Sequence, residues 1–468
     1  MDPTIELIAE IESYCQQTGM AESTFGRLAV NDGKLVSRLR KGKGITVRTT
    51  QRIQSFMRTK PRTDVSDGDK NTRAEKPLRQ TAQRPAPKLG AKKKAGTGSR
   101  PFRFYDNRQK YLAFVTTCDE KFRIAERAGR ELRHLRPRPP AMRLFDAGMG
   151  DGTVLTVLMR DMHRKFPTVP FFLVGKEISL EDVRLSLEKM PDRFFEHPAT
   201  VLVITNLYYA EAPWLMPADV KKAAALNWQE IPLAGTCSHE YSEQIKALNK
   251  TLVEGWQVKS SERTGNPLYV RPSVLVLYRE DHKFLLDDII PRPGQNHGMY
   301  DLVLASQPWR ARMSAQFKAQ KVLAPLTRSL GAKGRLIAVQ SYGRDPGLEI
   351  VQRVWPDENP FIVNRHELLA ELKKELGPMA RDFSFNALSD KKSIFRHHMH
   401  TLPTEISESI GTSTLFAAWN AAIYVAQIED DRLAKAISSG AYLVATSEVL
   451  KKHGGLWFND ETFVVARH

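Results

Sequence analysis

Five short hydrophobic runs recur along the chain from residue 141 onward. Runs of this kind are typical of parallel strands that are covered on both faces of a sheet. Longer segments with helical hydrophobic spacing separate the runs, at residues 153–166, 180–195 and 311–330. This alternation predicts one α/β domain over residues 104–468. The five predicted strands lie at residues 144–145, 170–178, 200–206, 300–306 and 334–340.

A long insertion separates the third and fourth of these strands, at about residues 210–297. It contains Trp214, Trp228 and Trp256 and a hydrophobic strand at residues 273–278. An insertion between sheet strands can form a lid or a substrate-selecting subdomain. Alternatively, it is a structural elaboration or forms a dimer surface. Helix is predicted before the first strand, at residues 104–136. Residues 441–446, a helix at 447–453 and a strand at 461–467 are predicted to close the fold.

The first 57 residues predict a separate small all-α domain. An amphipathic first helix ends near Gly19, and a second helix follows at residues 23–30 with Ser23 as its N-cap. A tight turn at residues 31–33 leads to a third helix at 34–40 and a fourth at 46–57.

Composition separates these two domains. Residues 58–103 carry 14 Lys or Arg against 4 Asp or Glu, and so hold a net charge of +10 out of +17 for all 468 residues. This segment is also rich in Pro, Gly, Ser and Thr, so it cannot bury enough apolar surface to fold and is expected to be a disordered basic linker. It either lies along nucleic-acid phosphates or only adds solubility.

The three cysteines are widely separated and form no CxxC pair, which argues against a disulfide framework or a zinc ribbon. No apolar stretch is long enough for a membrane span, and the acidic N-terminus does not resemble a signal peptide. These features predict a protein of the reducing cytoplasm.

The clearest chemical signal is the run Arg143-Leu-Phe-Asp-Ala-Gly-Met-Gly-Asp-Gly-Thr153. It reads as a strand that ends in Asp146, a turn with Gly148, Gly150 and Gly152, and the start of a helix. Strand, glycine turn and helix together let a backbone approach a nucleotide-like ligand at a helix N-terminus. Glu177 lies at the end of the second predicted strand, where an acid can bind the ribose hydroxyls of a nucleotide. A surface or capping role is the alternative.

The Asp-x-Gly-x-Gly-x-Gly run resembles motif I of the class I S-adenosylmethionine-dependent methyltransferases. The resemblance implies a doubly wound Rossmann-like sheet over residues 104–468 and S-adenosyl-L-methionine as cofactor. It also implies a ribose contact for Glu177 and an adenine contact near Asn206, where many relatives carry Asp; a turn-forming Asn is the alternative. The fourth strand's end would face the transferred methyl group. The implied cofactor and pocket residues are Asp146, Gly148, Gly150, Gly152, Glu177, Asn206, Ser306, Gln307 and Trp309.

The resemblance leaves the acceptor and the catalytic residues open. Ser306-Gln-Pro-Trp309 only partly matches the polar-Pro-Pro-aromatic run of amino-methylating nucleic-acid enzymes, so it does not identify a nucleic-acid substrate. Tyr208, Tyr209 and His297 are candidates for a base because they lie near strand ends. A transcriptional regulator whose methyltransferase-like domain senses a ligand without turnover is the alternative function, and an NAD-dependent oxidoreductase is a third.

The N-terminal domain resembles a repressor-type helix-turn-helix, with residues 34–41 as the recognition helix. The resemblance implies that Lys34, Ser37, Arg38 and Lys41 face DNA. A helical bundle that docks on the enzyme or on a partner, with a solvated basic face, is the alternative.

Other chemistries lack their motifs. The sequence contains no GxxxxGK[ST] phosphate loop and no GxSxG nucleophile turn. The run Arg396-His-His-Met-His400 offers His397, His398 and His400 to a metal. Adjacent histidines diverge on a helix and no acid lies close by in sequence, so a solvated or substrate-contacting segment and no metal are expected.

Overall fold

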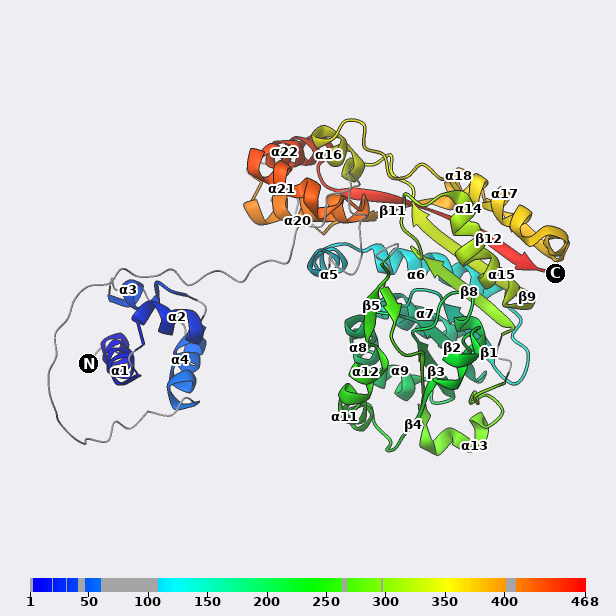
Figure 1. The fold of residues 1–468 in the computed structure, drawn as a ribbon, viewed down its shortest axis with the longest axis horizontal. Helices are drawn as coiled ribbons and strands as arrows, with labels where there is room; N and C mark the ends of the chain where they lie inside the picture. The colour runs from blue at the N-terminus through cyan, green and yellow to red at the C-terminus, as the bar shows by residue number, and fades with distance from the viewer. Residues whose placement is uncertain are drawn as a thin grey trace. The chain divides into compact units, whose positions relative to one another are not determined.

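The computed structural model describes residues 3–18, 20–30, 32–40, 47–59, 108–262, 267–295, 298–400 and 410–468 (Figure 1). The chain divides into two units, Met1–Lys93 and Lys94–His468. Apart from its first two residues, the linker predicted at 58–103 lies outside the described residues. Within them, no helix has the length and apolar character needed to cross a bilayer.

Four helices form the described part of the first unit, as the sequence predicts: α1 (Pro3–Thr18), α2 (Glu22–Val30), α3 (Leu35–Arg40) and α4 (Val47–Thr59). Ile11, Phe25, Leu39 and Ile53, one from each helix, are buried together. Because α2 begins at Glu22, Ser23 lies inside the helix, and its predicted role as N-cap is wrong.

A ten-stranded sheet is the centre of the second unit, in the order β10-β12-β9-β8-β1-β2-β3-β7-β4, with β11 paired to β12. The five predicted strands are all present. The strands are β1 (Met142–Asp146), β2 (Phe171–Lys176), β3 (Thr200–Thr205), β4 (Asn227–Leu233), β7 (Ser273–Arg279), β8 (Tyr300–Ser306), β9 (Leu330–Ser341), β10 (Phe383–Asn386), β11 (Ile394–His398) and β12 (Trp457–Arg467).

The order of the parallel strands reverses beside β1. The chain runs from β1 outward to β2 and β3, and then returns to place β8 and β9 on the other side of β1, all parallel. Ligands of open α/β sheets bind outside the carboxyl ends of the strands at such a reversal. The mostly parallel α/β sheet predicted from the sequence is therefore confirmed, and its switch point lies between β1 and β8.

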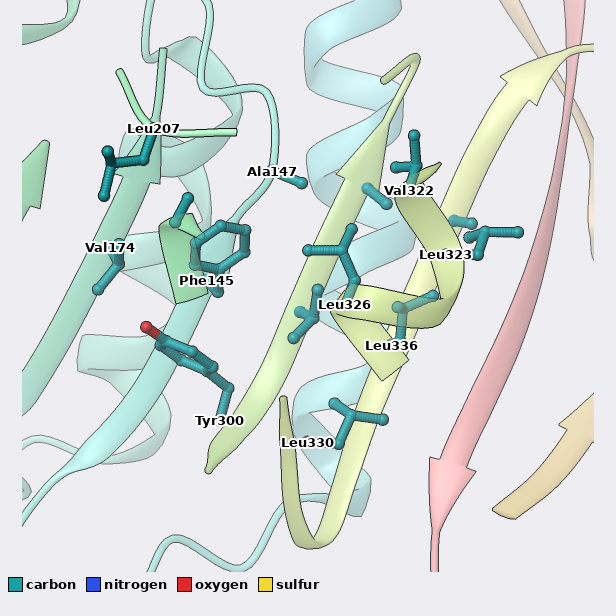
Figure 2. Close-up of a cluster of buried hydrophobic side chains, with 14 of the residues drawn as sticks. Phe145, Ala147, Val174, Leu207, Tyr300, Val322, Leu323, Leu326, Leu330 and Leu336 are labelled. Carbon is teal, nitrogen blue, oxygen red and sulfur yellow. The ribbon is translucent and has the colours of Figure 1, made fainter. Parts of the chain in front are cut away.

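Helices cover both faces of this sheet. One hydrophobic cluster joins the sheet to α6 (Glu120–Glu131), α7 (Thr153–Lys165), α8 (Leu180–Glu188), α9 (Pro191–Glu196), α11 (Ser238–Ala247) and α12 (Asn249–Gly255). A second cluster joins the opposite face to η5 (Ala319–Leu323), α15 (Ala324–Arg328) and α17 (Arg365–Leu376). Figure 2 shows part of this second cluster, including Phe145 and Tyr300 from the sheet and Leu326 from α15.

A third hydrophobic cluster lies at the start of β12. It is built from α5 (Arg108–Thr117), α16 (Pro346–Val354), α20 (Thr412–Val425), α21 (Asp430–Ser439) and α22 (Ala441–His453), and it includes Phe458 of β12. Strand β12 contains the strand predicted at 461–467 and runs antiparallel to β9. Its other edge pairs first with β11 and then with β10.

The insertion extends the sheet beyond β3. Strand β7 pairs antiparallel with β3, and β4 pairs with β7. The remaining short elements of the second unit are η2 (Leu132–His134), η3 (Ala212–Trp214), α10 (Val220–Ala224), β5 (Val258–Ser260), β6 (Pro267–Tyr269), η4 (Glu280–His282), α13 (Lys283–Leu286), α14 (Ala315–Lys318), η6 (Gly377–Asp382) and α18 (Asp390–Ser393).

Several predicted helix boundaries are wrong, for local reasons. The helix expected at 180–195 divides into α8 and α9 because Pro191 starts a new helix. The helix expected at 311–330 begins at Ala315 and contains the π-helical segment η5. This segment ends two residues before Pro325, whose missing N–H interrupts the regular helical bonds. In the described part of 104–136 the chain forms two helices, α5 and α6, followed by η2, and residues 441–453 form the single helix α22.

We predict that Gly152→Ala destabilises the second unit by about 3 kcal/mol. Gly152 has φ +76°, and a Cβ there would lie 2.7 Å from the Ser186 Cβ. Gly454→Ala is the matched control, because Gly454 has φ +66° with nothing within 4 Å of its Cβ position, and should cost only about 1 kcal/mol. Urea midpoints of the two variants test the difference, and equal midpoints would contradict it.

Candidate functional site

The glycine turn lies at the switch point of the sheet. It connects Asp146, the last residue of β1, to α7, and Gly150 and Gly152 both have positive φ, at 54° and 76°. A Cβ on Gly148 would lie 3.6 Å from the Ser306 carbonyl oxygen, so the turn passes beside the end of β8. The structure therefore brings Asp146, the three glycines and Ser306 together, as the sequence predicts.

Asp146 is a buried acid with one oxygen unused. The residue is 1% exposed, and Oδ1 accepts a hydrogen bond from the Gly148 N–H at 3.3 Å. No described residue hydrogen-bonds to Oδ2. Burial raises the pKa of Asp146 to about 7; the Gly148 N–H and the Lys121 charge oppose this rise, and Glu177 adds to it. Ionising this buried carboxyl group is therefore costly unless a cationic ligand lies beside it.

Glu177 is held against the glycine turn by backbone amides. One oxygen accepts from the Gly150 N–H at 2.9 Å, and the other accepts from Ile178 and Ser179 at 2.7 and 2.9 Å. The indole of Trp256, from the insertion, donates to the Glu177 carbonyl oxygen at 2.8 Å. A carboxylate has about four acceptor positions, so Glu177 keeps room to accept from a ligand hydroxyl.

Asn206 lies at the end of β3, where its side chain joins the insertion. The amide nitrogen donates to the carbonyl oxygens of Gly255 and Arg271, both at 2.9 Å, and the amide oxygen accepts from the Ser273 N–H at 2.8 Å. The residue is 1% exposed, and both polar atoms of its side chain bind backbone groups. These contacts favour a structural role for Asn206 over an adenine contact.

The three residues named as candidate bases are placed differently. The Tyr209 hydroxyl donates to the Pro308 carbonyl oxygen at 2.9 Å and so links the loops after β3 and β8. The Tyr208 ring stacks on Tyr269, with centroids 4.5 Å apart. His297 lies outside the described residues. The role of all three in catalysis stays a prediction.

Two side chains without any signal in the sequence lie over the glycine turn. If Gly150 carried a Cβ, it would lie 3.0 Å from the Tyr111 hydroxyl and 3.9 Å from the Lys121 Nζ. Although burial disfavours its charge, the nearby Glu120 and Asp151 carboxylates raise the pKa of Lys121. Tyr111 and Lys121 precede β1, on α5 and α6, and no local motif marks them.

The predicted pocket residues after β8 contact the ends of β9 and β12. Gln307 has φ +48°, and its amide nitrogen donates to the Ser341 hydroxyl at 3.1 Å and to Asp460 Oδ1 at 3.2 Å. The Trp309 indole donates to the Gln340 amide oxygen at 3.1 Å. Gln307 and Trp309 line a cavity of about 10 Å³, room for about one water molecule.

The histidine run is solvated only in part, because Arg396, His398 and His400 are exposed and His397 is buried. Residues 394–398 form β11, so His397 and His398 point to opposite faces of the sheet. His397 is 0% exposed and His398 is exposed. The expectation of a solvated run is therefore wrong for His397, because strand pairing with β12 determines its burial.

In the first unit, Lys34, Ser37 and Arg38 are exposed, and the apolar residues of α3 are buried. Arg38 forms an ion pair of 2.5 Å with Asp32, in the turn before the helix. Lys41 lies outside the described residues.

No family profile matches the sequence, and no curated protein matches it. Solved methyltransferases are similar to parts of the chain. A putative sarcosine dimethylglycine methyltransferase from Galdieria sulphuraria is 11% identical with a TM-score of 0.27, over 74% of this chain and 85% of its own. Geranyl diphosphate methyltransferase, solved with GPP and sinefungin, is 13% identical with a TM-score of 0.26, over 73% and 76%.

The rRNA methyltransferase aviRa from Streptomyces viridochromogenes is 15% identical with a TM-score of 0.20, over 52% of this chain and 76% of its own. TM-scores this low support no conclusion about function. The α/β fold assignment rests on the strand order and on the position of the glycine turn.

We predict that Asp146→Asn stabilises the second unit at neutral pH. The folded pKa of about 7 lies above the unfolded value near 3.9, so the wild type loses stability as pH rises from about 4 to 7. The asparagine does not titrate. The free energy of unfolding of the variant should therefore exceed that of the wild type by an amount that grows over this pH range. The difference should reach at most about 4 kcal/mol and then stay constant. Among the described residues, Lys121, Glu177 and Tyr209 are the charged or titratable groups that influence Asp146.

Thermal melting of both proteins between about pH 4.5 and about pH 8.5 tests this expectation. A difference in melting temperature that is constant across the range would show that Asp146 does not titrate there.

Proposed function

We propose that the Lys94–His468 unit is a methyltransferase that binds S-adenosyl-L-methionine between the ends of β1, β2 and β8. The main evidence for this proposal is Asp146. Its buried carboxylate keeps one oxygen without a hydrogen bond from the described residues, beside a turn of glycines at the switch point. That arrangement suits a ligand with a cationic group and a nucleoside.

Three side chains fit the parts of this cofactor. Glu177 accepts from the ribose hydroxyls, as an acid after the second strand does in nucleotide-binding sheets. Asp146 holds the ammonium group of the methionine part, and Lys121 holds its carboxylate. The glycine turn lets the backbone approach the ligand closely.

The bound cofactor supplies a methyl group on a positively charged sulfur, which is already activated for transfer. The protein's residues then have two tasks, to align the acceptor and to exclude water. Tyr111 and Lys121 cover the turn from one side, and the Tyr209–Pro308 hydrogen bond closes the gap between the loops after β3 and β8.

We predict that Lys121→Met weakens binding of S-adenosylhomocysteine at least 10-fold, because the variant loses the cation that meets the ligand carboxylate. Affinity for 5′-methylthioadenosine, which lacks the amino-acid part, should change less than 3-fold. Calorimetry with both ligands on the full chain measures the two effects separately.

Lys165→Met is the control, since the Lys165 ammonium binds the Leu132 carbonyl oxygen away from the turn, and it should bind both ligands as the wild type does. Equal losses for both ligands in Lys121→Met would contradict the assigned orientation. A wild type that binds NADH and neither adenosyl ligand would end the methyltransferase proposal. A wild type that binds S-adenosylmethionine but methylates nothing in fractionated cell extract would favour a ligand sensor.

We also propose that the first unit binds duplex DNA through α3. Ser37 and Arg38 of this helix, and Lys34 directly before it, are exposed, while the apolar residues of the helix face the core. A short helix with basic exposed residues after a tight turn suits the major groove.

We predict that Lys34→Ala with Arg38→Ala weakens DNA binding at least 10-fold and lowers the salt dependence of the affinity, because two phosphate or base contacts are lost. Lys246→Ala with Lys250→Ala removes the same charge from the second unit and should have little effect. Fluorescence anisotropy at several salt concentrations gives both quantities. Indistinguishable curves for the two double variants would contradict the recognition helix.

A further inference from the structure

Three potential metal ligands meet in the interior of the second unit. Glu120 is the first residue of α6, His397 lies on β11 and Asp460 lies on β12, and their exposed fractions are 6%, 0% and 0%. Each offers one ligand atom within 4.8 Å of the others. The sequence shows no acid close to the histidine run, and the fold brings two acids to it from distant segments.

Strand register brings two of the three together. In the antiparallel pair of β11 and β12, His397 lies opposite Phe458, and Asp460 lies opposite Phe395. Residues two apart on a strand share a face, so His397 and Asp460 are diagonal neighbours on one face of the sheet. The His397 Nε2 and the Asp460 Oδ2 are 3.7 Å apart.

Three buried polar atoms of this group have no hydrogen-bond partner among the described residues. No described residue hydrogen-bonds to Nδ1 or Nε2 of His397, or to Oδ2 of Asp460. The imidazole is instead packed between aromatic rings, stacked on Phe458 at 5.3 Å and edge-on to Phe114 at 5.9 Å. Buried polar groups are nearly always paired, so three unpaired atoms at one point indicate a missing partner.

A metal ion is a partner that can meet these atoms together. An imidazole nitrogen and two carboxylates all offer lone pairs, so a single cation can meet all three side chains at one point. Gln307 donates one hydrogen bond to Oδ1 of Asp460, and Oδ2 has no partner among the described residues. Two buried carboxyl groups beside an imidazole match the donor set of a metal site.

We propose that Glu120, His397 and Asp460 bind one divalent transition-metal ion. Metal bonds of about 2.1 Å to nitrogen or oxygen place neighbouring ligand atoms roughly 3 to 3.5 Å apart, so the 3.7 Å between His397 and Asp460 is already close to a bound geometry. Two carboxylates suit Mn²⁺ and an imidazole suits Zn²⁺. Three protein ligands leave further coordination positions open.

The three proposed metal ligands lie near the glycine turn but include none of the proposed cofactor-binding residues. Glu120 and Lys121 are consecutive residues. Lys121 reaches the glycine turn, while Glu120 lies near Asp460. Gln307, directly after β8, contacts Asp460. An ion bound there would therefore lie at the same edge of the sheet as the glycine turn.

The test uses the full chain after dialysis against a chelator. Mn²⁺ is titrated while the electron paramagnetic resonance signal of free Mn²⁺ is followed, and Zn²⁺ retained after gel filtration is counted by mass spectrometry. One ion per chain is expected with at least one of the two metals. His397→Gln should weaken its binding at least 100-fold, and Glu120→Gln at least 10-fold.

His398→Gln is the matched control, because His398 is the neighbouring histidine on the opposite face of β11, and it should bind as the wild type does. Circular dichroism checks that each variant is folded. If His397→Gln does not fold, Glu120→Gln and the wild-type titration decide. Wild-type protein that binds neither metal at 1:1 stoichiometry with about 1 mM metal, or folded Glu120→Gln and His397→Gln variants with wild-type affinity, would overturn the proposal.

Discussion

Lys121 lies among acidic groups buried at the carboxyl edge of the parallel strands, and the arrangement of this edge depends on its charge. Against the effect of burial, Glu120 and Asp151 raise the pKa of Lys121, and its charge in turn opposes the rise in the pKa of Asp146. A buried carboxylate without compensation is costly. Because α6 supplies both Glu120 and Lys121, the position of this helix before β1 links the glycine turn to the start of β12.

The sequence predicts the part of the fold in which local pattern and burial agree. Strands β1, β2, β3, β8 and β9 are covered on both faces, so each appears as a hydrophobic run, and positive φ at Gly150 and Gly152 explains the glycine turn. Strands β10 and β11 have no such signal, because they are short and their pairing with β12 is determined by residues far away in the sequence. The intrinsic strand propensity of a segment contains no information about such distant partners.

The same distinction applies to the candidate site. Asp146 and Glu177 follow the hydrophobic runs that locate the strand ends. Tyr111 and Lys121 come from helices whose packing over the turn has no local signal. Asn206 also follows a strand end, yet its amide is used by backbone groups of the insertion. Position at a strand end therefore identifies candidates, and long-range contacts decide which of them face a ligand.

Charge balance connects the two proposed ligands. Asp146, Asp460 and Glu120 have raised pKa values because burial disfavours their charged forms, and Lys121 is the cation that acts on all three. S-adenosylmethionine carries a sulfonium and an ammonium against one carboxylate, so it adds one positive charge beside Asp146. A divalent ion adds two beside Glu120 and Asp460. Each ligand would let its neighbouring acids ionise in the interior, and Lys121, placed between the two groups, would then be free to meet the cofactor carboxylate.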